Sequence, residues 1–161
     1  MRLSPVLASL LVAAAPWGTL QAGELFKSGQ FTVRKVDNTC KLEIQLHEGT
    51  TQPAAILALF PADDYYGELF TEKSRIGLAH EKVTIKFDND KPREISFVAD
   101  AAAKDANWRW QYLESTDGIL DNVARKGKMN VEFSNGKQSF TYTVVLKGSG
   151  KAVKAVKTCK P

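Results

Sequence analysis

The first 22 residues limit the possible folds of this chain more than any other feature, because they have the pattern of a secretory export signal. Arg2 supplies the charged start, an apolar core runs from Leu7 to Ala15, and Ala22 offers a small residue at the cut. We therefore expect residues 1–22 to be a signal peptide and residues 23–161 to form one domain, periplasmic or secreted. The alternative is an uncleaved anchor, but this core is shorter than the roughly 20 residues of a membrane span. No equally long apolar stretch follows, so we expect no transmembrane segment after cleavage.

The two cysteines, Cys40 and Cys159, both lie in the exported part, where thiols are oxidised. We expect a disulfide between them, which would tie the start of the domain to its last element and stabilise the fold. Two free thiols or an intermolecular bridge are the alternatives. Neither cysteine belongs to a C-x-x-C pair, so the sequence does not indicate redox catalysis.

The charge balance is mild, with a formal net charge of +4. A nucleic-acid-binding domain normally has a clustered basic excess with interleaved aromatic residues, so we expect no nucleic-acid partner. The lysines that gather near the C-terminus, from Lys147 to Lys160, are interpreted as a solvated helix face. Weak attraction to an acidic partner or an anionic envelope surface is the alternative.

Short runs of alternating apolar and polar residues predict strands joined by turns. The clearest run is Cys40–Leu46, in which the cysteine and three aliphatic residues share one face. The other predicted strands are Phe31–Val36, Ala54–Phe60, Val83–Phe87, Ile95–Phe97, Trp108–Tyr112, Met129–Phe133 and Phe140–Val144. Strands this short, without crossover helices, favour antiparallel pairing.

Two helices are predicted in the C-terminal part. Thr116 or Asp117 is expected to cap a short helix that ends near Gly127, and Ser149 to cap a final helix that turns Cys159 inward. The predicted fold class is therefore mainly β: an antiparallel β-sandwich or partly open barrel with one short internal helix and a C-terminal helix.

Two groups of aromatic residues are candidates for recognition. The segment from Pro61 to Lys73 is interpreted as a long irregular loop, and it carries the predicted binding residues Asp63, Asp64, Tyr65, Tyr66 and Glu68. Trp108, Trp110 and Tyr112 share one face of a strand. They are interpreted as a core stripe, and as a peptide, glycan or partner groove if they prove exposed.

Residues for catalysis are scarce. His47 and His80 are the only histidines, and both are expected on solvent-facing positions of strands. The acidic residues of the 61–73 loop have no histidine in the same segment, and no recognisable zinc ligand set remains if the cysteines are oxidised. We therefore expect no enzymatic activity, no catalytic residue, no metal and no cofactor.

A series of short motifs extends from Ile76 to Val156. They are Ile76–Leu78, Val83–Asp88, the helix Gly118–Lys126, Lys126–Lys128, Val131–Phe133 and Val144–Ala152. In this order they resemble the exported bacterial family named after invasion-associated locus B, although the chain lacks the extra cysteine pair usual in that family. The resemblance implies an exported β-rich domain with a role at the envelope or in host interaction, and it carries over no catalytic residue.

The function predicted from the sequence is an exported, non-enzymatic binding module that recognises a protein or an envelope polymer. An inhibitor or immunity protein is one alternative, in which the Tyr65-Tyr66 loop would plug the active site of an envelope-targeting enzyme. A weakly catalytic envelope hydrolase and a purely structural accessory subunit are the others.

Overall fold

The computed structural model describes residues 23–49, 52–61, 67–72, 82–101, 108–134 and 138–159, so the predicted signal peptide lies outside the described residues. Within these ranges the chain forms ten strands and two helices. The strands are β1 (Gly23–Ser28), β2 (Phe31–Val36), β3 (Thr39–Leu46), β4 (Ala55–Leu59), β5 (Gly67–Glu72), β6 (Lys82–Phe87), β7 (Arg93–Ala101), β8 (Trp108–Leu113), β9 (Lys128–Ser134) and β10 (Ser139–Val145). The helices are α2 (Ile119–Arg125) and α3 (Ser149–Thr158).

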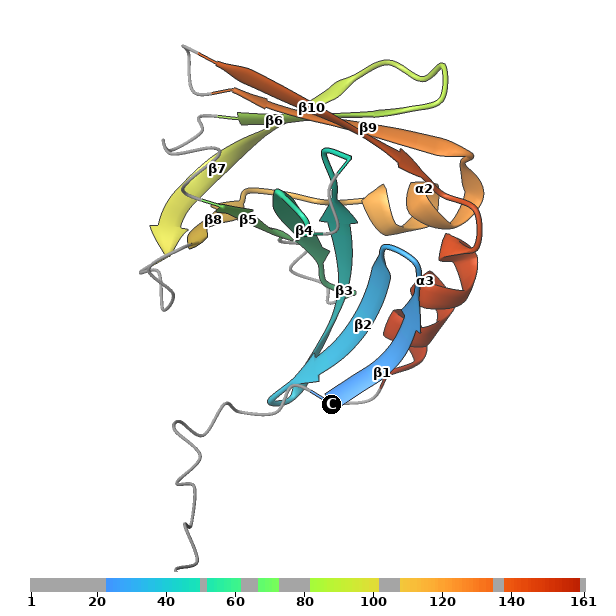
Figure 1. The fold of residues 1–161 in the computed structure, drawn as a ribbon. Coiled ribbons are helices and arrows are strands. Elements are labelled where there is room, and N and C mark those ends of the chain that lie inside the picture. The colour runs from blue at the N-terminus through green and yellow to red at the C-terminus, as the bar shows by residue number, and fades with distance from the viewer. Residues whose placement is uncertain are drawn as a thin grey trace, which may run out of the picture.

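All strands belong to one antiparallel sheet in the order β1-β2-β3-β4-β5-β8-β7-β6-β9-β10. The sheet curls, so that β6, β9 and β10 lie across from β2, β3 and β4, while α2 and α3 stand together at one side (Figure 1). The predicted fold class, a mainly β antiparallel sandwich or partly open barrel with two helices, is confirmed. Strands β1 and β5 are additional to the predicted set.

Two side-chain hydrogen bonds join the halves of the curled sheet. The Gln30 amide, in the turn between β1 and β2, donates to the Val145 carbonyl at the end of β10 over 2.8 Å. The Tyr142 hydroxyl of β10 donates to Glu48, just after β3, over 3.0 Å. No backbone ladder connects β1 with β10 in the described part of the chain, so the sheet stays open at this edge.

The core fills the space between the two halves. Leu42, Ile44 and Leu46 alternate along the inward face of β3, as their spacing predicts, and pack in the same cluster as Val131 and Phe133 of β9. Residues from the helices complete the cluster, namely Ile119, Leu120 and Val123 of α2 and Ala152, Val153 and Val156 of α3. Burying each large aliphatic side chain stabilises the fold by about 1.5–3 kcal/mol.

The helix starts differ from the prediction. Gly118 and Gly148 occupy the N-cap positions with φ of 71° and 87°, a left-handed conformation that glycine adopts without steric cost. Ser149 is instead the first residue of α3, and its buried hydroxyl donates to the carbonyls of Val123 and Leu146 over 2.5 and 2.7 Å. The serine therefore joins α3 to α2, and the expected capping by Thr116, Asp117 or Ser149 is wrong.

The predicted disulfide is present. Cys40 begins the inward face of β3, Cys159 follows the last turn of α3, and their Cα atoms lie 6.2 Å apart. The bond holds α3 against the side of the sheet formed by β1, β2 and β3 (Figure 1). A disulfide of this kind is typical of proteins that fold outside the cytoplasm.

None of the helices in the described ranges combines the length and apolar character needed to cross a membrane.

Candidate functional site

The candidate site lies on the face of the sheet that is turned away from the core, across β2, β3, β4, β5 and β8. We call it the outer face. The strand register aligns its side chains in rows that cross the strands. One row contains Glu43, Ala58, Glu68 and Tyr112, and the next contains Gln45, Ile56, Phe70 and Trp110.

The aromatic stripe of β8 belongs to this outer face. The opposite face of β8 carries Arg109, Gln111 and Leu113, of which Gln111 is only 2% exposed and Leu113 is in the core cluster. Trp108 and Trp110, like Tyr112, are half-buried and do not belong to that cluster. The interpretation of this stripe as part of the core is therefore wrong.

The aromatic rings of the outer face contact one another from strand to strand. Phe70 of β5 stacks on Trp110 of β8 with ring centroids 5.3 Å apart, and Tyr112, in the neighbouring row of the same strand, has its ring centroid 5.4 Å from that of Trp110. The Lys41 ammonium of β3 lies 5.0 Å from the centroid of Phe70, a cation–π arrangement. A continuous strip of aromatic surface thus crosses β5 and β8 and ends beside a lysine.

Charged side chains are embedded next to this aromatic strip. Lys41 lies 3.1 Å from Glu43 and 3.7 Å from Glu68, and its side chain is only 13% exposed. Arg34 of β2 pairs with Glu43 at 2.9 Å, so Glu43 has two cations. Among the residues that the structure describes, Glu68 pairs with Lys41 alone. Buried charges need such partners, because transferring an unpaired charge out of water costs several kcal/mol.

Burial of Glu68 raises the pKa of its carboxyl above the ordinary 4.5, because desolvation disfavours the ionised form. The charge of Lys41 and its hydrogen-bonding contact act in the opposite direction and lower the pKa, while Glu43 adds a smaller upward effect. The indole N–H of Trp110 lies near enough to lower the pKa slightly, although the two groups do not reach hydrogen-bond geometry. The ionised form of Glu68 is therefore disfavoured by its burial, in spite of the neighbouring Lys41.

A cavity of about 200 Å³ opens beside Glu68. Its described lining consists of Val36, Asp37, Thr39, Lys41, Phe60, Glu68 and Trp110. Two polar atoms here, Oε2 of Glu68 and Nε1 of Trp110, are buried and make no hydrogen bond within the part of the chain that the structure describes. Buried polar atoms are nearly always satisfied in folded proteins, so this pair calls for a partner from outside the described chain, either an ordered water or another molecule.

Of the binding residues predicted from the sequence, the structure places only Glu68. It lies in strand β5, where an irregular loop was expected, and it is 5% exposed. Asp63, Asp64, Tyr65 and Tyr66 lie outside the described residues, so their role stays a prediction. Lys41, Phe60 and Phe70 were not predicted as site residues, because Lys41 and Phe60 occupy ordinary strand patterns and Phe70 was assigned to the loop.

The histidines do not join this cavity in the described structure. His47 is exposed beyond the end of β3, four residues from Glu43, which corresponds to about 13 Å along a strand. His80 lies outside the described residues. In the ranges that the structure describes, no three or more His, Cys, Asp and Glu residues group together in a way that could hold a metal ion.

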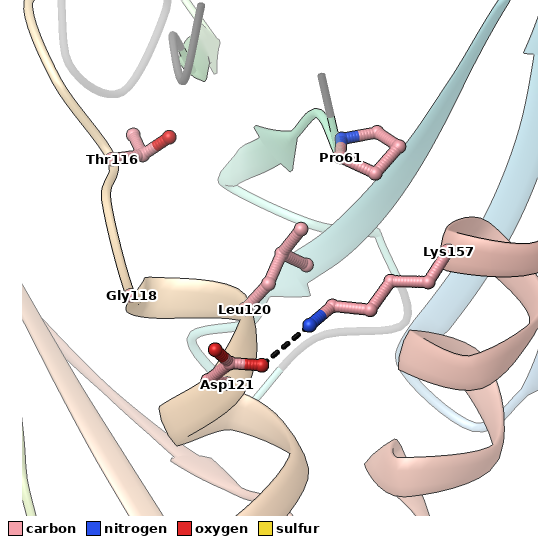
Figure 2. Close-up of a pocket in the computed structure, with 6 residues that line it drawn as sticks. All are labelled: Pro61, Thr116, Gly118, Leu120, Asp121 and Lys157. Atoms are coloured by element: carbon pink, nitrogen blue, oxygen red, sulfur yellow. Dashed lines mark hydrogen bonds and ion pairs between the residues drawn. The ribbon is translucent and has the colours of Figure 1, made fainter. Parts of the chain in front are cut away.

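A second cavity, of about 310 Å³, lies between the two helices (Figure 2). Leu120 and Asp121 of α2 and Lys157 of α3 line it together with Pro61, Thr116 and Gly118. The Lys157 ammonium binds Asp121 over 2.5 Å, and this contact lowers the pKa of the Asp121 carboxyl. The charged groups here satisfy one another, which makes this cavity a weaker candidate than the one beside Glu68.

Comparison with solved structures identifies a similar fold. A crystal structure from Bartonella henselae superimposes on 81% of this chain and 94% of its own, with a TM-score of 0.58. The chain shares the fold of invasion-associated protein B. Sequence identity to invasion-associated protein B is 12%, so the similarity concerns the fold and does not transfer residues of a site. No protein-family model matches the sequence, and no curated protein matches it either.

Proposed function

We propose that this chain is an exported, non-enzymatic binding module that recognises a protein or an envelope polymer in the periplasm through the outer face of its sheet. The observation that supports it most is the cavity beside Glu68, in which two buried polar atoms make no hydrogen bond within the described chain and aromatic rings supply apolar surface. Small-molecule and side-chain sites commonly combine an apolar lining with a few such polar groups.

Two further observations support this proposal. Partly buried aromatic residues are over-represented in recognition surfaces because they give large contact area for little conformational entropy. The fold is also that of invasion-associated protein B, a protein whose name connects it with invasion. For this chain we propose recognition of a component of the envelope. The proposal includes no catalytic activity.

The test compares capture of ligands by the wild-type protein and by a variant of the outer face. Phe70→Ala combined with Tyr112→Ala removes two rings of the aromatic strip, and we expect it to weaken retention on insoluble envelope polymer or on periplasmic proteins at least tenfold. Val145→Ala is the matched control, because Val145 is an apolar residue 63% exposed on β10, in the other half of the sheet. Thermal unfolding checks that each variant is folded.

Full retention by a folded double variant would contradict the placement of the site on the outer face. In that case Tyr65→Ala with Tyr66→Ala tests the predicted loop directly. Loss of retention in the loop variant alone would place recognition in the loop, and absence of any ligand for the wild-type protein would favour the structural accessory role.

A further inference from the structure

The two polar atoms in the cavity beside Glu68 limit the kinds of ligand that can bind there. This inference rests on the proposed binding function and asks which class of ligand the cavity accepts. A carboxylate oxygen accepts hydrogen bonds, whereas an indole N–H only donates them. A single group that satisfies both atoms must therefore accept from Trp110 and donate to Glu68. A hydroxyl does both with one oxygen atom.

Charge argues against an ionic ligand. The ammonium of Lys41 is already neutralised by Glu43 and Glu68 at 3.1 and 3.7 Å, so an incoming anion would compete with two carboxylates. An incoming cation would meet the same ammonium at close range, because Lys41 itself lines the cavity. Bringing a further charge into such a site carries a desolvation cost. Asp37, the remaining charged residue of the lining, could offset that cost only for a cation, which a cationic probe tests.

The size and the apolar lining of the cavity also favour a small uncharged ligand. The volume of about 200 Å³ is below the range of about 300–1,000 Å³ typical of sites for drug-sized molecules, so it suits one small ring or one short group. Phe60 and Trp110 supply flat apolar surface next to the polar atoms. A ring that has hydroxyls on its edge and C–H groups on its faces matches both kinds of surface.

We propose that the cavity beside Glu68 binds one ring of a neutral sugar, with a hydroxyl that accepts a hydrogen bond from the Trp110 indole and donates one to Glu68. The aromatic strip of Phe70, Trp110 and Tyr112 continues away from the cavity along the outer face. A linked sugar therefore finds further aromatic surface beyond the first ring, and an oligosaccharide binds more tightly than its monomer.

The test uses the full mature chain with Trp110→Phe and Trp108→Phe as a matched pair. Both tryptophans are half-buried on the same face of β8, but only Trp110 lines the cavity. Trp110→Phe keeps an aromatic ring and removes the N–H donor. We expect it to weaken binding of chitotriose or maltotriose about tenfold in calorimetry, with Trp108→Phe close to wild type.

Indole N–H resonances give a second readout that does not depend on a loss of affinity. The two variants assign the signals of Trp108 and Trp110, and titration with either neutral trisaccharide is expected to shift the Trp110 signal. Trilysine and trigalacturonic acid serve as cationic and anionic probes, and we expect no shift of that signal. Binding to insoluble envelope polymer, lost in Trp110→Phe, would identify the polymer as the source of the sugar.

An unshifted Trp110 signal with both neutral sugars would overturn the sugar proposal, since an ordered water then satisfies the two atoms. A shift with a charged probe alone would overturn it as well. The proposed binding function would survive either result if Phe70→Ala with Tyr112→Ala still abolished retention of another envelope component, so the two failures are distinguishable.

Discussion

Gly67 and Thr116 approach so closely that a Cβ atom on residue 67 would lie 2.7 Å from Cγ2 of Thr116. The same Cβ would be 3.0 Å from Leu113 and 3.2 Å from the carbonyl of Ala58. Gly67 is the first residue of β5 and immediately precedes Glu68, so this contact positions the strand that carries the buried acid. Position 67 therefore requires glycine, because the neighbouring atoms leave no space for a Cβ atom.

Gly67→Ala is therefore expected to destabilise the protein by about 1–3 kcal/mol, the usual cost of overpacking a filled region. Adding Thr116→Ser removes the methyl group at the shortest distance and should recover part of the loss. Gly150→Ala is the control, because its Cβ would meet no atom closer than 3.5 Å and alanine favours the helix. Urea unfolding measures all four proteins, and equal effects of Gly67→Ala with and without Thr116→Ser would contradict the proposed contact.

Replacing the buried lysine should cost far more than replacing an exposed one. Lys41→Met leaves Glu68 without its cation, and we expect a loss of about 3 kcal/mol at neutral pH, since a buried charge then stays unpaired. Lys82→Met breaks the ion pair of Lys82 with Glu94 at 2.7 Å, whose side chains are 50% and 62% exposed, and should cost at most about 1 kcal/mol. Similar losses in the two variants would show that Lys41 is not an essential counter-ion.

The raised pKa of Glu68 predicts a pH-dependent difference between the wild-type protein and Glu68→Gln. The folded state holds the Glu68 proton to higher pH than the unfolded state, whose carboxyl titrates near 4.5. The stability from this group is therefore present below that value and is lost as the pH rises through the folded pKa. Because glutamine resembles the protonated acid, the stability of Glu68→Gln relative to wild type should increase as the pH rises from about 4.5 through the folded pKa of Glu68. A constant difference in the free energy of unfolding would refute the assignment.

Opening the disulfide should lower stability strongly without changing the fold. Cys159→Ser frees a loop of 119 residues, for which the chain-entropy model gives a loss of about 4–5 kcal/mol. Reducing the wild-type protein should reproduce this loss, and reductant should have no effect on Cys40→Ser with Cys159→Ser. Denaturant unfolding with and without reductant measures the change in the free energy of unfolding. A loss below about 1 kcal/mol would contradict the prediction.

The sequence predicted most of the strands because their inward faces are apolar and their outward faces polar. Cys40–Leu46 shows this alternation clearly, and β3 follows it. Strand β5 was missed because Glu68 and Thr71 are both buried, on opposite faces, so the polarity of the strand does not alternate. A strand that buries polar residues on both faces loses the alternation by which strands are recognised.

The candidate site was predictable only in part for a related reason. Period-two spacing placed Trp108, Trp110 and Tyr112 on one face of a strand, but spacing does not tell which face packs on the core. Hydrophobicity favoured packing of the aromatic face against the core. In the structure Gln111 is buried on the core side of β8, and the two tryptophans are half-buried on the opposite side. The pairing of Lys41 with Glu68 joins residues of strands that are not adjacent in sequence, and no local pattern indicates it.

The bond between Cys40 and Cys159 also changes what proteolysis can do to the molecule. It converts the stretch between them into a covalent ring, to which β1 and β2 are attached as a short tail. One cleavage anywhere in that ring opens it but releases no fragment, because both new ends remain linked through the sulfur atoms. A nicked molecule would keep the same mass plus one water and would separate into two pieces only after reduction. Outside the cytoplasm, a single cut in this ring thus leaves the whole chain covalently connected.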